Sequence, residues 1–100
     1  MDTSILAKKT ITILGRKYKL KHMSRDKLLK IHGTPVHGLH DAMIRTIYIE
    51  TDSSEQFRLG VLRHECVHAA LAVTGLDQVI PPEFQEILCE TFASLMEDLS

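Results

Sequence analysis

Residues 61–75 read VLRHECVHAALAVTG, and this stretch decides how the rest of the chain is interpreted. It contains an H-E-x-x-H pattern formed by His64, Glu65 and His68. Residues four apart in an α-helix lie on one face, one turn above the other, so the two imidazoles would converge on a single position. The pattern therefore predicts a helix that presents two nitrogen ligands side by side.

The flanking residues supply both ends of such a helix. Residues 52–54 (DSS) are of the kinds that cap helix N-termini, and Glu55 or Gln56 stands three residues after a possible cap. At the other end, Gly75 suits the position after the last helical residue, where the left-handed conformation is common. We expect one helix between these signals.

Two imidazoles at this spacing form half of a tetrahedral zinc site, with Zn–N distances of about 2.0–2.1 Å. Glu65 follows the first of them, so its carboxylate would lie beside the metal and act as the general base for a water that attacks a carbonyl. Alternatively, His64 and His68 are polar residues on the amphipathic face of a buried helix. Two buried imidazoles and a carboxylate are costly without a metal, so the metal site is the better interpretation. The donors favour Zn²⁺, although iron, manganese and nickel accept the same set.

A third protein ligand is expected from the last predicted helix, which Pro81 and Pro82 open. Its glutamates are Glu83, Glu86, Glu90 and Glu97. Glu86 and Glu90 are one turn apart and share a face, and Glu86 follows His68 by 86 − 68 = 18 residues, enough for a loop and an antiparallel return. Either of these two can supply the ligand, whereas we expect Glu83 and Glu97 to be solvated.

The segments before the H-E-x-x-H helix predict a small sheet. Residues 10–21 (TITILGRKYKLK) alternate on both sides of Gly15-Arg16, which is typical of a hairpin with one buried and one basic face. Residues 24–32 predict a short helix between Ser24 and Gly33, residues 33–43 a loop, and residues 44–50 (IRTIYIE) a strand. The expected fold class is α+β, with a single domain over residues 1–100.

The two predicted helices resemble those of a known family. LRHECVHAALAVTGL, followed by PPEFQEILCETFASL, is similar to the minimal zincin-like metallopeptidase domains of phages and prophages. The resemblance covers roughly residues 40–100 and implies a hairpin and an edge strand packed on the H-E-x-x-H helix and a C-terminal glutamate helix. Residues 86–90 resemble the E-x-x-x-D pair of thermolysin-like enzymes, which implies Glu86 as the zinc ligand and Glu90 as the residue that orients a ligand histidine. The reverse assignment stays open.

The resemblance implies a zinc-dependent metallopeptidase whose peptide or protein substrate lies along the strand at residues 44–50. A catalytically inactive, zinc-stabilised protein-binding module is the alternative, because no tyrosine or histidine follows the pattern to stabilise an oxyanion. A nucleic-acid-associated protein is a third possibility, since residues 1–30 hold nine Lys and Arg against two Asp. These basic clusters are short and interleaved with core residues, which favours an ordinary solvated strand face.

The remaining histidines and cysteines are expected to have plainer roles. We expect His37 and His40 to be exposed loop residues, although either could contact an oxyanion or a metal. Cys66 and Cys89 are too few for a disulfide framework and are expected to be packed free thiols. No stretch is long and apolar enough for a membrane span and no secretory signal is recognisable, so we expect a cytoplasmic protein, in the host cell if it is phage-encoded.

Overall fold

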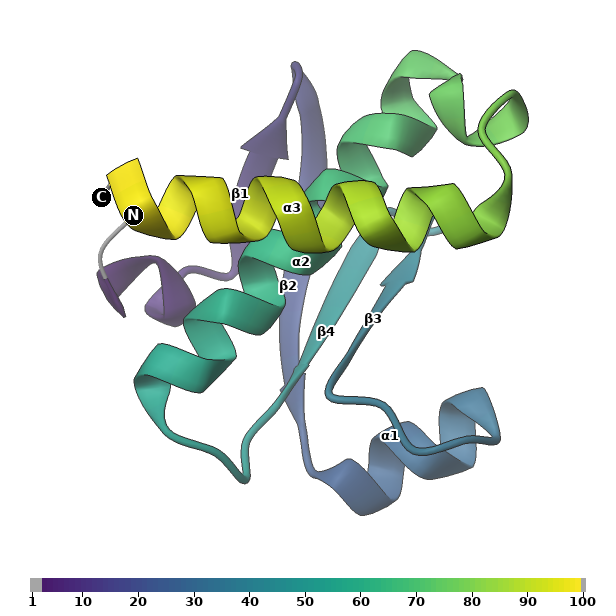
Figure 1. Ribbon diagram of the computed structural model, residues 1–100. Helices are drawn as coiled ribbons and strands as arrows, with labels where there is room; N and C mark the ends of the chain where they lie inside the picture. Colours follow the sequence, from purple (N-terminus) through teal and green to yellow (C-terminus); the bar gives the residue numbers. More distant parts are fainter. Residues whose placement is uncertain (1–2, 100) are drawn as a thin grey trace.

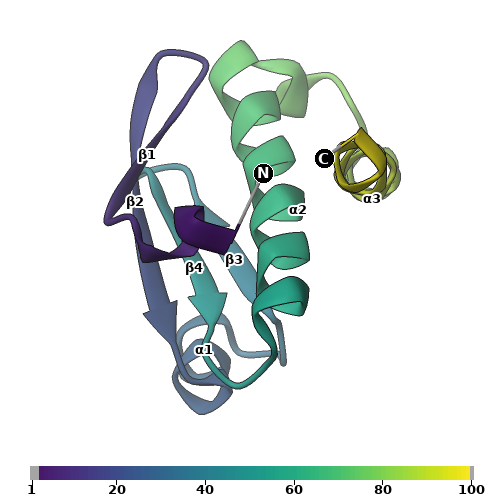
Figure 2. The same ribbon diagram turned by 90° about the vertical axis from the view of Figure 1, so that its left-hand side faces the viewer.

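The computed structural model describes residues 3–99 and is an α+β fold built in layers. In chain order its elements are the 3₁₀ turn η1 (Thr3–Ala7), strands β1 (Thr10–Ile13) and β2 (Arg16–Met23), helix α1 (Arg25–His32), strands β3 (Gly38–Asp41) and β4 (Thr46–Glu50), helix α2 (Glu55–Thr74), the 3₁₀ turn η2 (Leu76–Gln78) and helix α3 (Pro82–Leu99). The sheet, α2 and α3 follow one another as three layers (Figure 2), and α3 crosses over α2 (Figure 1). Among the described residues, no helix is both long and apolar enough to span a membrane.

The sheet has the strand order β1-β2-β4-β3. β1 and β2 form the predicted antiparallel hairpin, and β2 then runs parallel to β4. The hairpin turn is made by Leu14 and Gly15, with φ of 47° and 81°, rather than by Gly15 and Arg16. Two consecutive positive φ values are what a tight two-residue hairpin turn requires.

Strand β3 occupies part of the segment that was expected to be a loop. It pairs antiparallel with β4, from Gly38 opposite Ile49 to Asp41 opposite Thr46. Because β4 lies between β2 and β3, it has no free edge, and the prediction that a peptide pairs with residues 44–50 is wrong. The free edges of the sheet are β1 and β3.

The helix boundaries follow the predicted caps. The side chain of Ser24 accepts a hydrogen bond from the backbone N–H of Lys27 at the start of α1, and Ser54 does the same for Phe57 at the start of α2. Gly75 ends α2 in the left-handed conformation, with a φ of 80°. Helix α2 thereby places the H-E-x-x-H pattern in its interior.

The core lies between the sheet and α2. Its buried members are Leu6, Ile13, Tyr18, Leu20, Ile47, Ile49, Leu59, Leu62 and Ala69. Helix α3 stands outside this core, and Cys89 is the one α3 residue that is buried in the described part of the chain. The apolar stripe of α3 is consequently left largely open, with Phe84 54% exposed and Ile87 60% exposed.

Candidate metal centre

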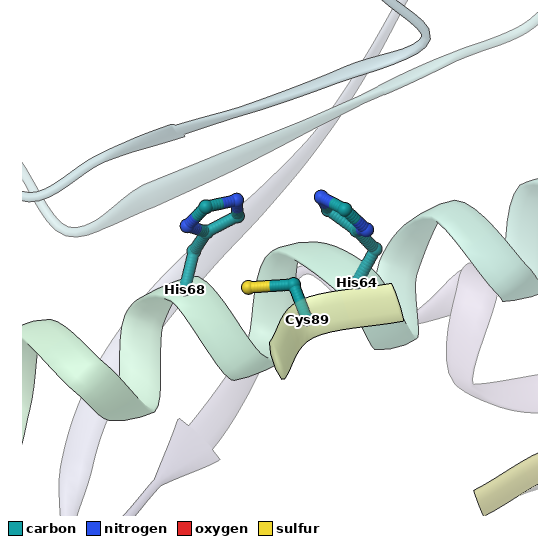
Figure 3. Close-up of side chains that lie close together, drawn as sticks. All are labelled: His64, His68 and Cys89. Atoms are coloured by element: carbon teal, nitrogen blue, oxygen red, sulfur yellow. The ribbon is translucent and has the colours of Figure 1, made fainter. Parts of the chain in front are cut away.

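The two histidines of the H-E-x-x-H pattern lie in α2, where this helix faces α3. Their side chains retain only 17% exposure for His64 and 20% for His68. The ring centroids are 5.0 Å apart, as expected for residues one helical turn apart. Figure 3 shows both rings on one side of α2, with the sulfur of Cys89 reaching across from α3.

Glu86 brings a carboxylate from α3 to both rings. One of its oxygens lies 3.2 Å from Nε2 of His64, and the other lies 2.9 Å from Nε2 of His68. Both Nε2 atoms therefore face the same carboxylate. Two imidazole nitrogens and one carboxylate oxygen are a donor set that zinc uses in catalytic sites.

Glu90, also in α3, contacts the other ring nitrogen of His64. Its carboxylate lies 2.5 Å from Nδ1 of His64, on the opposite side of the ring from the atom that faces Glu86. A carboxylate at Nδ1 fixes the ring orientation and leaves Nε2 free to act as a ligand. Only Glu86, of these two glutamates, contacts both histidines among the ion pairs of the described residues.

Glu65 lies beside the two histidines and is 8% exposed. Burial raises the pKa of its carboxyl to about 7, an effect that the positive charge of His64 opposes and the negative charge of Glu86 reinforces. Burial also lowers the pKa of His68, which favours the neutral imidazole that can bind a metal. A carboxyl with a pKa near neutrality can both accept and return a proton at physiological pH.

A cavity of about 850 Å³ opens above these residues. Strand β3 forms one wall and α3 the other, while His64, Glu65 and His68 of α2 line the space between them. The close approach of β3 depends on Gly38, because a Cβ atom there would lie 2.5 Å from Cγ1 of Val61 and 3.2 Å from Cγ of Glu65. The free edge of the sheet thus runs along the cavity.

His37 and His40 also line this cavity, and each has a polar partner. Nε2 of His40 lies 3.3 Å from the hydroxyl of Tyr18, and burial lowers the pKa of His40, as does the nearby charge of His68. Nδ1 of His37 lies 2.8 Å from the buried carboxylate of Glu50. The prediction of an exposed loop histidine is confirmed for His37, which precedes β3 and has a side chain that is 55% exposed, although the Glu50 carboxylate contacts it. The prediction is wrong for His40, which lies in β3 and is partly buried.

The cysteines have different surroundings. Cys66 is partly buried against the hydrophobic core, as predicted, and burial raises the pKa of its thiol to about 12. Cys89 is fully buried, and its sulfur and one ring nitrogen of each of His64 and His68 all lie within 4.8 Å of one another. Burial, and then the charges of nearby glutamates, raise the pKa of the Cys89 thiol to about 12.

The structure brings together the five residues of the predicted site: His64, Glu65, His68, Glu86 and Glu90. It adds Cys89, which was expected only to pack. The position of Cys89 in the chain offered one signal, since it follows Glu86 by three residues and so lies near that side chain on the helix. His64, His68 and Cys89 form a group that can hold a metal ion.

No family model matches the chain, and no curated protein or solved structure matches it either.

Proposed function

We propose that this protein is a zinc-dependent metallopeptidase, with His64, His68 and Glu86 as metal ligands and Glu65 as the general base. The observation that carries the proposal is the contact of one Glu86 carboxylate with Nε2 of both histidines, beside a buried carboxyl on an open cavity. These donors fit zinc, which accepts two imidazoles and a carboxylate and keeps a further position for water or substrate. When bound, zinc acts as a Lewis acid and lowers the pKa of water.

Three further residues would have separate roles in peptide hydrolysis. Glu65 takes a proton from the attacking water and returns it to the leaving amine. Glu90 holds Nδ1 of His64 and so keeps the ligand nitrogen pointed at the metal. His40, on the wall formed by β3, would contact the substrate carbonyl, because no tyrosine or histidine follows the H-E-x-x-H pattern.

The substrate side of the proposal concerns β3. An extended peptide would add to its free edge through main-chain hydrogen bonds and lie along the cavity. The opposite wall, α3, carries Glu86, Glu90 and Glu97 into the lining. We therefore expect a peptide segment with basic side chains to bind better than an acidic one.

The alternative of a zinc-stabilised binding module without turnover is favoured by a separate observation. Helix α3 leaves several large apolar side chains exposed, among them Phe84, Ile87, Phe92, Leu95 and Leu99. Open apolar patches often mark contact surfaces for other proteins. In contrast, Lys17, Lys19 and Lys21 alternate with buried residues and point away from α2, so no feature of the cavity involves the basic face.

The test compares zinc content and peptidase activity in the wild type, Glu65→Gln and Glu83→Gln. We expect about one zinc per chain in all three, and at least a hundredfold lower cleavage of a labelled, denatured protein in Glu65→Gln only. Glu83→Gln is the matched control, because Glu83 is an exposed α3 carboxylate outside the cavity lining. Zinc binding with no cleavage by the wild type would favour the binding module, and a folded protein that takes up no zinc would refute both.

A further inference from the structure

We infer that Cys89 is a fourth protein ligand to the metal, and that it closes the site in the resting protein. This inference rests on the metal site proposed above. With three protein ligands, a tetrahedral metal keeps one position for water, whereas with a fourth it keeps none. Neither the H-E-x-x-H pattern nor the glutamate helix requires a cysteine at this place.

The sulfur of Cys89 lies close to the two histidines of the proposed metal site. The sulfur of Cys89 and one ring nitrogen of each of His64 and His68 lie within 4.8 Å of one another. Ligand atoms on one tetrahedral zinc ion are separated by roughly 3.3–3.8 Å, as follows from Zn–N and Zn–S bond lengths of about 2.0–2.3 Å. A contraction of at most about 1.5 Å at the widest pair would therefore complete the coordination.

Cys89 is the buried residue of α3 at the interface with α2. It is fully buried, whereas the side chains of Glu86 and Glu90 are 60% and 73% exposed. The sulfur reaches from α3 toward the two imidazole rings of α2 (Figure 3). Glu86 and Cys89 are three residues apart on one helix, so their side chains leave neighbouring positions on one face of α3.

Binding of the Cys89 thiolate would change how many positions of the metal remain open. When the thiol binds, a sulfur–metal bond forms, the S–H bond breaks, and the proton leaves to solvent. Two imidazoles, one carboxylate and one thiolate would give the metal four protein ligands and leave no position for water, as in structural zinc sites. Turnover then requires that the thiolate leave the metal, whereas a binding module keeps it in place.

Cys66 provides the matched control. It is the only other cysteine in the chain, and it lies in α2 between Glu65 and His68 in sequence. Its side chain packs against the hydrophobic core, and it does not belong to the group formed by Cys89 and the two histidines. Evidence that the Cys66 sulfur binds the metal would therefore contradict the inferred position of the site.

The experiment loads the purified wild type, Cys66→Ala and Cys89→Val with Co²⁺ and records the near-ultraviolet thiolate-to-cobalt charge-transfer band. We expect the band in the wild type and Cys66→Ala, and its loss in Cys89→Val. Zinc affinity of Cys89→Val should fall by more than about tenfold, since removal of an outer-shell partner of a metal ligand already has an effect of this size. Valine keeps the buried position apolar and of similar size, which favours folding.

X-ray absorption on the zinc-loaded wild type makes the test independent of the variants. One sulfur neighbour at about 2.3 Å, retained in Cys66→Ala, supports the inference even if Cys89→Val fails to fold. Zinc bound through nitrogen and oxygen alone overturns the inference and leaves the peptidase proposal standing. A sulfur ligand together with cleavage that Glu65→Gln does not change would sink the peptidase proposal and leave Cys89 as a ligand.

Discussion

Among single residues, Gly38 determines how closely β3 approaches the metal centre. A Cβ atom at this position would lie 2.5 Å from Cγ1 of Val61 and 3.1 Å from the carbonyl oxygen of Tyr48. One of these neighbours is backbone in the central strand, so β3 must move outward. We expect Gly38→Ala to lower the free energy of unfolding by about 1–3 kcal/mol, the usual cost of overpacking, measured by urea unfolding.

Gly60 offers the matched substitution. It lies in α2, and a Cβ atom there would meet no heavy atom within 4 Å. Alanine is favoured over glycine inside a helix by about 1 kcal/mol, so Gly60→Ala should be more stable than the wild type. Equal stability of Gly38→Ala and Gly60→Ala would mean that β3 does not press against α2 as described.

Glu65 makes the stability of the metal-free protein depend on pH. Burial raises the pKa of its carboxyl from 4.5 to about 7, so the folded protein holds this proton over a range in which the unfolded chain has lost it. The contribution of Glu65 to stability is therefore lost as pH rises from 4.5 to about 7. We expect Glu65→Gln to gain up to about 3 kcal/mol relative to wild type across this range, at 1.36 kcal/mol per pKa unit.

Urea unfolding with a chelator present, at about pH 5 and about pH 8, measures this difference. His68 also titrates in the folded protein, but it is present in both proteins, so the comparison largely cancels its effect. Glu83→Gln is the control for the loss of one carboxylate, because Glu83 is an exposed residue of α3. A constant difference between wild type and Glu65→Gln at both pH values would show that Glu65 is not buried as described.

The elements differ in how well the sequence predicts them. The hairpin, α1 and α2 follow from local signals, namely alternation around Gly15 and the caps at Ser24, Ser54 and Gly75. Strand β3 could not be predicted, because Gly38–Asp41 has no apolar alternation and becomes a strand only by pairing with β4. That pairing is a tertiary effect, and it also removed the free edge expected for residues 44–50.

In the candidate site, too, some features follow from local sequence patterns and others depend on tertiary contacts. His64 and His68 share a face because of helical spacing alone, and Glu86 and Glu90 share a face of α3 for the same reason. The position of Cys89 close to the two histidines depends on how α3 lies across α2, which no local pattern specifies. The roles of His37 and His40 likewise depend on β3 and on the buried Glu50.

The two glutamates of α3 should respond differently to substitution. Glu86→Gln removes the charged oxygen that faces both histidines, so zinc should be largely lost. Glu90→Gln removes a partner of Nδ1 of His64, and zinc affinity should fall by about 10–100-fold while one zinc per chain still binds at saturation. Competition with a zinc-binding dye measures both affinities. A greater loss in Glu90→Gln than in Glu86→Gln would exchange the two roles.

On the scale of the whole molecule, helix α3 is attached to the rest of the described chain mainly through α2. The sheet and α2 share the hydrophobic core, whereas α3 buries only Cys89 among the described residues and keeps most of its apolar stripe open. The ion pairs of Glu86 and Glu90 with the histidines are partly solvated, so each stabilises the contact only modestly. A metal bound between α2 and α3 would therefore add most to the attachment of α3.

Zinc should consequently order α3 more than the rest of the molecule. In hydrogen exchange, we expect amides of α3 to exchange fast in the chelator-treated protein and to become protected when zinc is added. Amides of β4 and the first half of α2 should stay protected in both states, because they belong to the core that α3 does not share. Zinc should also raise the melting temperature with its concentration, since it binds only the folded protein. Glu86→Gln should abolish both effects, and protection of α3 that is independent of zinc would mean that apolar packing alone holds this helix.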